Sequence, residues 1–186
     1  NGIRMTRAAV VRETARQLMD TTIKTFLDWF PPGVCGEYMR TTKTYFFKVG
    51  DIECEVMFRA LDDADDVRNL NSLELTFAWF NECRDIHPEI IDGMSKRIGR
   101  YPSKKDGGPT WFGMWGDTNP PTMDTWWYYQ MEGLDPDDGV TKNDNGWSIY
   151  KQPSGRGPYA ENVGNLPDNY YDIQGRSEEY IRVYID

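Results

Sequence analysis

The sequence has little of what builds a metal centre or a disulfide framework. It contains three cysteines, Cys35, Cys54 and Cys83, one histidine, His87, and no CxxC spacing. An odd number of dispersed cysteines does not pair into a framework, and zinc sites need clustered cysteine and histidine ligands. The sequence therefore argues against both kinds of site and favours a reducing compartment.

Long apolar runs are also missing. No stretch approaches the roughly 18 apolar residues of a membrane-spanning helix. The opening residues, NGIRMTRAAVV, contain neither the apolar region nor the cleavage site of a signal peptide. We therefore expect no membrane contact and no secretion.

Positive charge is in the minority, with 21 basic against 30 acidic residues and a net charge of -9. Phosphate neutralisation supplies most non-specific affinity for nucleic acids, so this balance disfavours a dedicated nucleic-acid binder. A local basic cluster, SKRIGRYPSKK, contains Arg97 and Arg100. These two residues have a functional interpretation as DNA or inter-subunit contacts, and a simpler one as caps of a helix end.

The chain is long and apolar enough for one sizeable core, with 186 residues of which 39% are hydrophobic. Apolar runs at strand spacing alternate with stretches at helical spacing. This alternation predicts an α/β sheet, mostly parallel and flanked by helices. The expected elements are a strand at 6–13, a helix at 14–30, a hairpin around Gly50-Asp51, a strand at 75–80, a helix at 88–98, an apolar run at 111–115 and a helix at 124–131, followed by a long loop at 133–146.

Polar residues end two of these apolar runs. LTFAWF stops at Asn81 and Glu82, and the run WFGMW is followed by Asp117-Thr118-Asn119. In open parallel sheets, chemistry collects at the carboxyl ends of the strands. Two neighbouring strands of this kind would offer a carboxylate for an attacking water and polar donors for a transferring phosphoryl group.

One motif of nucleotide hydrolases is absent. No GxxxxGK[ST] occurs, because Gly107-Gly108 and the run SGRG at 154–157 lack both the spacing and the Lys-Ser/Thr end. The backbone amides and lysine that hold phosphates in such enzymes are therefore not in this sequence.

Several longer segments, in their order along the chain, resemble the ATPase region of the large terminase subunit of tailed bacteriophages. They are VVRETARQLMDTTIKTFLDWFP, ELTFAWFNECRDIHPEIIDGMSKRIGRYPS, WGDTNPPTMDTWWY and QPSGRGPYAENVGNLPDNYY. The resemblance covers nearly the whole chain. It implies a P-loop NTPase fold of the additional-strand type, with a β-hairpin insertion. Residues 1–186 would be one partial domain, with the phosphate-binding loop upstream and the nuclease domain downstream.

The resemblance also implies roles for individual residues. It makes 75–82 the Walker B strand, Glu82 the catalytic glutamate, and Thr118-Asn119-Pro120 the coupling motif. Asn81 stands where many members carry an aspartate that holds the water shell of magnesium, so here only a neutral oxygen is offered, alongside Glu82.

The implied cofactors are ATP and Mg²⁺. The implied partners are double-stranded viral DNA, a portal protein and the small terminase subunit, with a homo-oligomeric ring on the portal in the bacterial host cytoplasm. The whole protein would hydrolyse ATP to translocate DNA into the procapsid, whereas residues 1–186 without the loop would be inactive. Two other functions stay open: a helicase-like nucleic-acid translocase, and a non-catalytic binding module.

Each assigned residue has a second interpretation. Glu82 could be a carboxylate at the start of a helix, and Asn119 could initiate a turn before Pro120-Pro121. Arg68 is a candidate arginine finger for a neighbouring subunit's nucleotide. A salt bridge to Asp65 or Asp66 is the alternative for Arg68.

Overall fold

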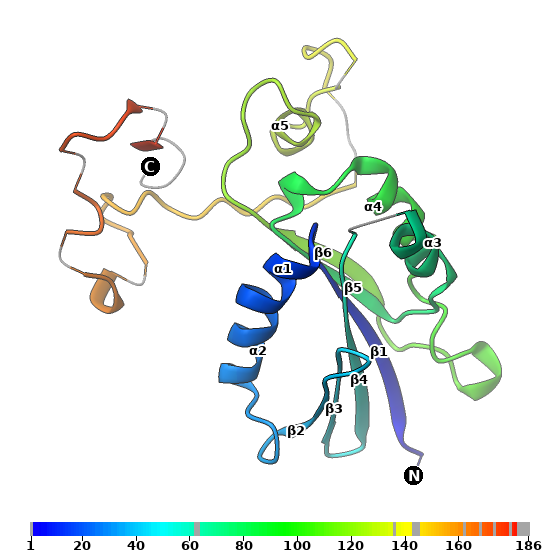
Figure 1. The fold of residues 1–186 in the computed structure, drawn as a ribbon. Helices are drawn as coiled ribbons and strands as arrows, with labels where there is room; N and C mark the ends of the chain where they lie inside the picture. The colour runs from blue at the N-terminus through cyan, green and yellow to red at the C-terminus, as the bar shows by residue number, and fades with distance from the viewer. Residues whose placement is uncertain are drawn as a thin grey trace. The chain divides into compact units, whose positions relative to one another are not determined.

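The computed structural model describes residues 2–61, 64–135, 137–142, 146–161, 163–167, 169–172, 174–178 and 180–181. The chain divides into two compact units, Asn1–Thr118 and Asn119–Asp186. The first unit contains the sheet and its covering helices, and the second contains the helix α5 (Trp126–Glu132) and a series of turns (Figure 1).

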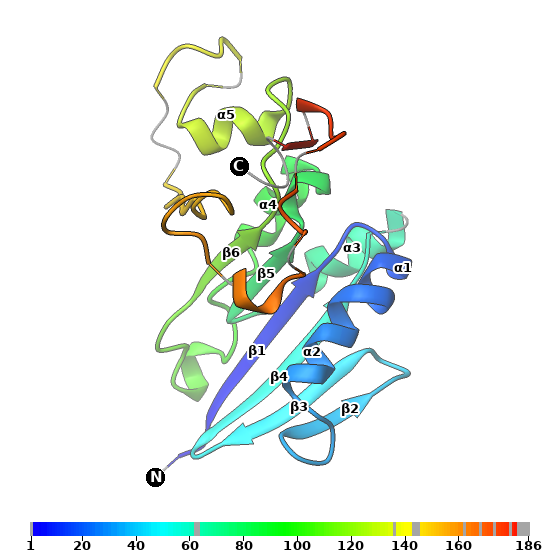
Figure 2. The ribbon, with the colours of Figure 1, turned by 90° about the vertical axis from the view of Figure 1, so that its left-hand side faces the viewer.

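The first unit is built on a six-stranded sheet in the order β2-β3-β4-β1-β5-β6. β1 pairs in parallel with β4 and β5, and β5 pairs in parallel with β6, whereas β2, β3 and β4 form an antiparallel meander (Figure 2). This is the mostly parallel α/β sheet that the sequence predicts. The strands are β1 (Arg4–Val11), β2 (Gly36–Met39), β3 (Thr44–Val49), β4 (Ile52–Arg59), β5 (Phe77–Asn81) and β6 (Gly113–Asp117).

One face of the sheet is covered by a single helical segment. It runs through α1 (Ala15–Gln17), a π-helical stretch η1 (Leu18–Ile23) and α2 (Lys24–Trp29). The Thr14 hydroxyl caps its start by accepting a hydrogen bond from the amide of Gln17. Its apolar side packs on alternate residues of β1 and β4 and on Tyr45 of β3. Together they form a core of Ala8, Val10, Leu18, Ile23, Tyr45, Cys54, Val56 and Phe58.

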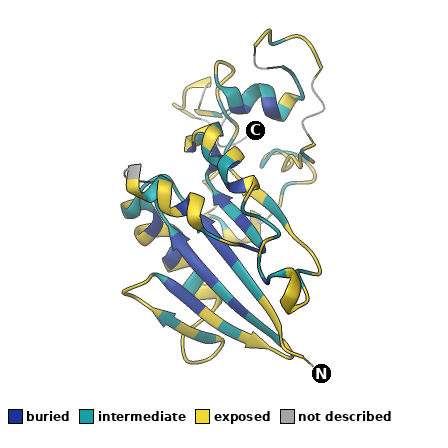
Figure 3. Cartoon of the chain, turned by 90° about the vertical axis from the view of Figure 1, so that its right-hand side faces the viewer, coloured by how far each residue is buried: buried dark blue, intermediate teal, exposed yellow. Residues whose placement is uncertain are grey.

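The opposite side of the sheet carries α3 (Ala64–Ser72) and α4 (Pro88–Ser95) (Figure 1). Leu70 of α3 and Met94 of α4 are buried, as are Ala9 and Val11 on β1. Helices on both sides explain why the central strands are buried along much of their length (Figure 3). α4 begins at Pro88 behind His87, whose ring accepts a hydrogen bond from the amide of Glu89.

The second unit is organised around α5 (Trp126–Glu132). The Thr125 hydroxyl accepts from the amide of Tyr128 at its start, and Gly133 ends it in the left-handed conformation. Trp127 is buried and contacts the ring of Trp147 edge-on, with the centroids 6.1 Å apart. A 3-10 turn, η4 (Val163–Asn165), is the last element with described bounds.

Most expected elements are confirmed, with shifted ends. The helix expected at 88–98 stops at Ser95, because Ile98 pairs with Leu75 in an isolated parallel bridge. The acidic stretch that begins at residue 61 forms α3 from Ala64 onward, while residues 62–63 lie outside the described part. β2 was not expected. Within the described residues, no helix has both the length and the apolar character needed to cross a membrane.

Candidate functional site

The carboxyl ends of three parallel strands meet at one edge of the sheet. In the register, Val11 of β1 stands opposite Phe80 of β5, and Asn81 of β5 stands opposite Asp117 of β6. The predicted neighbourhood of the two polar strand ends is therefore confirmed. We call this edge the rim and define it as Arg12, Asn81, Glu82, Asp117 and Thr118.

Asn81 lies at the centre of a hydrogen-bond network. Its Oδ1 accepts from Nη1 of Arg12 at 2.8 Å and from Oγ1 of Thr22 at 2.6 Å. Its Nδ2 donates to Oδ2 of Asp117 at 2.9 Å. Two donors on one side and a carboxylate on the other determine which end of the amide is oxygen. The side chain of Asn81 thus links β1, the π-helical stretch and β6.

Asp117 accepts hydrogen bonds on both of its oxygens. Oδ2 takes the bond from Asn81, and Oδ1 takes one from the indole Nε1 of Trp79, two residues earlier on β5. The residue is nevertheless exposed. A carboxylate has about four lone-pair sites, so two remain for water or a ligand.

Glu82 follows directly in an unusual backbone conformation. Its φ of 54° and ψ of 56° are left-handed, which costs an L-residue roughly 1–2 kcal/mol. Such backbone strain clusters at functional sites. The Glu82 carboxylate accepts a hydrogen bond from Oγ1 of Thr118 at 3.3 Å and makes no capping bond to η2 (Cys83–Asp85). The side chain therefore reaches toward β6 and does not serve as a helix-start cap.

The residue after Glu82 makes a close contact with β6. Cys83 is buried, and a β-carbon built on Gly116 would lie 3.0 Å from its Sγ. Only a glycine lets β6 pass so near to the thiol without displacing it. Burial, helped by the negative charge of Asp117, raises the pKa of the Cys83 thiol to about 12.

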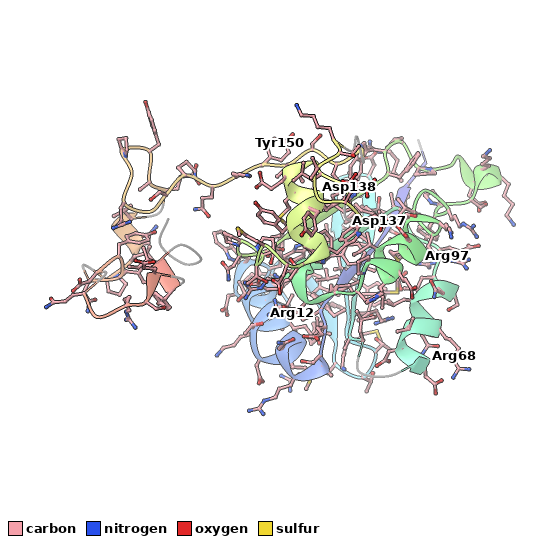
Figure 4. All side chains as sticks on the ribbon, turned by 90° about the horizontal axis from the view of Figure 1, so that it is seen from above. Arg12, Arg68, Arg97, Asp137, Asp138 and Tyr150 are labelled. Atoms are coloured by element: carbon pink, nitrogen blue, oxygen red, sulfur yellow. The ribbon has the colours of Figure 1, made fainter. Side chains whose placement is uncertain are left out.

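The other predicted site residues lie away from the rim. Arg68 is on α3, where its exposed side chain pairs with Asp65, well away from Arg12 in Figure 4. Arg97 and Arg100 follow α4, and their backbones bond to Leu75, which precedes β5 at the end opposite Glu82. Nε of Arg97 is buried without a hydrogen-bond partner in the described part of the chain.

The first two residues of the expected coupling motif fall on either side of the division between the units. Thr118 is the last residue of the first unit, and Asn119 is the first residue of the second. Thr118 is joined to Glu82, as described above. The motif therefore connects the rim to the start of the second unit through one peptide bond.

Three rim contacts were not foreseen from the sequence: those of Arg12, Thr22 and Asp117 with Asn81. A signal for Thr22 existed, because it occupies a position of the apolar helix stripe and is buried there at 5% exposure. A hydroxyl in such a stripe needs a partner. Arg12 directly follows β1, so its position at the rim could be predicted only by knowing that β1 and β5 are neighbours.

The rim offers two carboxylates as possible metal ligands. Its carboxylates are Glu82 and Asp117, and among the residues described no group of three or more His, Cys, Asp or Glu side chains could hold a metal. Mg²⁺ usually keeps several waters and is held by one or two carboxylates together with substrate phosphates. Two carboxylates at one edge suit that mode of binding.

Comparison with known proteins finds solved structures with a similar fold. No protein-family model matches the sequence, and no curated protein matches it significantly. Among solved structures, one of the large terminase from a thermophilic bacteriophage aligns with 98% of this chain and 39% of its own, at a TM-score of 0.58 and 11% identity. The fold is that of a phage large terminase.

Further structures of that protein agree. A second covers 76% of this chain and 36% of its own, with a TM-score of 0.52 and 12% identity. A complex with ADP covers 68% and 29%, with a TM-score of 0.50 and 12% identity. At such identities the likeness concerns the fold alone. The chain spans between 29% and 39% of the length of these terminase structures.

Proposed function

We propose that this chain is the central part of the ATPase motor of a phage large terminase, which hydrolyses ATP with Mg²⁺ to drive viral DNA into the procapsid. The observation that carries the proposal is the rim, where Glu82 adopts a left-handed conformation and bonds to Thr118 of the neighbouring strand. The terminase fold supports it.

In this proposal Glu82 orients and activates the attacking water. Phosphoryl transfer depends mainly on positioning and on electrostatic stabilisation, so a carboxylate with a defined orientation is what the reaction needs. The Thr118 hydroxyl supplies that orientation by donating to one carboxylate oxygen, which leaves the other oxygen for water. Magnesium, when bound with the nucleotide, would neutralise charge on the phosphates.

Movement would begin at the coupling motif. Because Thr118 and Asn119 belong to different compact units, a change in what Thr118 contacts would be passed along the chain to the second unit. Loss of the γ-phosphate is the event that would change those contacts. The proposal therefore assigns the step from chemistry to motion to the peptide bond between the two residues.

The proposed partners are double-stranded DNA, the portal protein and the small terminase subunit, in the host cytoplasm. Arg97 and Arg100 would contact DNA or a neighbouring subunit. Arg68 would act across a ring, because its exposed side chain on α3 is remote from its own chain's rim.

The test of catalysis is Glu82→Gln in the protein that joins this chain to a phosphate-binding loop. ATP binding should stay within a few-fold of the unmodified protein, while turnover falls by about 10²–10⁴-fold, as for loss of a general base. Glu89→Gln, which alters an exposed glutamate in the first turn of α4, is the matched control and should change neither quantity. Equal losses of binding and turnover would reject the catalytic role.

The absence of GxxxxGK[ST] from the sequence favours a second candidate, a non-catalytic binding module. Calorimetric titration of residues 1–186 with ATP and magnesium separates the two functions. The motor proposal expects no ATPase activity and binding far weaker than micromolar, because the amides and lysine that hold the phosphates are missing. Micromolar binding by these residues would instead support the module.

A further inference from the structure

The hydrogen bonds around Asn81 suit one negative charge, and not two, at positions 81 and 117. Oδ1 of Asn81 already accepts two hydrogen bonds, and its Nδ2 lies 2.9 Å from Oδ2 of Asp117. An aspartate at position 81 would replace that donor by an oxygen facing another carboxylate oxygen. Two carboxylates at such a distance repel each other, or share a proton. The amide is therefore matched to the carboxylate across the strands.

The same bonds leave Asn81 without a free acceptor. A carbonyl oxygen has two lone pairs, and here Arg12 and Thr22 occupy both. Asn81 thus has no oxygen lone pair for a water of a metal shell. Asp117 is exposed and keeps about two of its four acceptor sites after its bonds to Asn81 and Trp79.

We propose that Asp117 on β6 is the carboxylate that binds the water shell of nucleotide-bound Mg²⁺ at this rim, and that Asn81 is its positioning residue. The inference rests on the proposed function and moves the magnesium role from Asn81 to Asp117. The Arg12 guanidinium strengthens the arrangement, because a charged donor on Oδ1 polarises the amide and makes Nδ2 a better donor to Asp117.

A charge swap between the two positions tests the pairing. Four forms of residues 1–186 are compared by thermal unfolding: the unmodified chain, N81D, D117N and the double variant N81D/D117N. N81D should have the lowest melting temperature, because it creates facing carboxylates, and the double variant should regain most of the loss. Equal melting temperatures for N81D and the double variant would overturn the pairing.

Nucleotide binding tests the magnesium role without relying on turnover. In the protein that carries the phosphate-binding loop, ADP affinity is measured by calorimetry with Mg²⁺ and with EDTA. In D117N, the gain in ADP affinity on adding Mg²⁺ should be about 10–100-fold smaller, which is the range for altered groups around a metal. The ADP affinity measured in EDTA should be unchanged. D117E and N81D/D117N should keep the magnesium effect, because each retains one carboxylate. Asp92→Asn, an exposed acid on α4, is the control.

The outcomes separate the two claims. If Mg²⁺ raises the ADP affinity of D117N as much as it raises that of the unmodified protein, the inference is wrong and the proposed function stands. If the unmodified protein binds no nucleotide under either condition, the proposed function fails and this inference fails with it. A loss in D117N that D117E restores supports the assignment, since a purely structural defect would also reduce the affinity measured in EDTA.

Discussion

Thr118 and Glu82 are joined across two neighbouring strands, with the hydroxyl Oγ1 of Thr118 donating to Oε2 of Glu82 at 3.3 Å. The residues follow the paired ends of β6 and β5, where Asp117 stands opposite Asn81. The bond therefore depends on the strand register. It ties the orientation of the proposed catalytic carboxylate to the start of the second unit.

Removing this hydroxyl should slow ATP hydrolysis. Thr118→Val keeps the shape of the side chain but loses the donor, which for a charged acceptor is worth about 1.5–3 kcal/mol. Turnover in the loop-containing protein should fall by roughly tenfold or more, whereas Thr118→Ser should stay near the unmodified rate. Steady-state ATPase rates at saturating ATP measure this. Identical rates for the two variants would show that the hydroxyl does not orient Glu82.

Alkaline pH should destabilise the first unit through its two buried thiols. Burial raises the pKa of Cys54 and of Cys83 from 9.0 to about 12. A raised pKa means that the folded state holds its proton more tightly than the unfolded state, so the stabilisation is complete below pH 9. It is lost progressively as pH rises from 9.0 toward about 12. The partly buried Tyr38 and the buried Tyr45, whose pKa values are also raised, act in the same direction at higher pH.

Urea unfolding at pH 8, 9, 10 and 11 measures this effect. The free energy of unfolding should decline above pH 9, by an amount on the order of a few kcal/mol in total. A variant with Cys54→Ala and Cys83→Ala should start lower, because two buried side chains are truncated, but should decline less steeply with pH. If the free energy of unfolding falls equally steeply with pH in the two proteins, the thiols are not the cause.

The rim was partly predictable from the sequence, because apolar runs that end in polar residues indicate strands and where they stop. That argument located Asn81, Glu82 and Thr118 at one edge. It could not predict the bond from Arg12 to Asn81, which requires β1 to lie beside β5. Strand order depends on how the whole sheet assembles, so the local sequence VVRE does not predict it.

Other features of the structure were not predicted from the sequence, for reasons specific to each place in the chain. β2 was missed because GEYM is a short edge strand beside Pro31-Pro32-Gly33, where turn formers dominate the pattern. Its Gly36 lies so close to Phe46 that a β-carbon would be 2.2 Å from the carbonyl oxygen, a contact visible only once the strands are paired. Asp117 was recognised as a strand end, but its bond to Asn81 depends on a register that one residue of slip would abolish.

A methyl group at Gly116 should disturb its packing against Cys83. The new β-carbon would lie 3.0 Å from Sγ and 3.2 Å from Cβ of Cys83. We expect Gly116→Ala to lower the free energy of unfolding by about 1–3 kcal/mol, the usual cost of overpacking. It should also speed the reaction of Cys83 with a thiol reagent. Gly164→Ala, where nothing lies within 4 Å, is the control and should leave both unchanged.

Arg68 should act in a neighbouring subunit if it is an arginine finger. Arg68→Ala and Glu82→Gln would each inactivate the loop-containing protein, but mixed rings would contain some sites with both groups and should regain ATPase activity. Asp65→Asn removes the ion-pair partner on α3 and serves as control. If Asp65→Asn reproduces the loss and mixing restores nothing, Arg68 is only a surface ion pair, which is worth about 0–1 kcal/mol.

Asn119→Ala separates coupling from a turn-forming role. Asn119 begins the second unit directly after Thr118, so a coupling residue here should affect movement more than hydrolysis. We expect the variant, in the full-length protein with its portal, to hydrolyse ATP at a near-normal rate while packaging less DNA per ATP consumed. A residue that only initiates the turn before Pro120-Pro121 would instead lower the melting temperature and reduce both activities in proportion. ATPase rate, packaged length and melting temperature are therefore measured on one preparation, and unchanged packaging per ATP would leave Asn119 with a structural role alone.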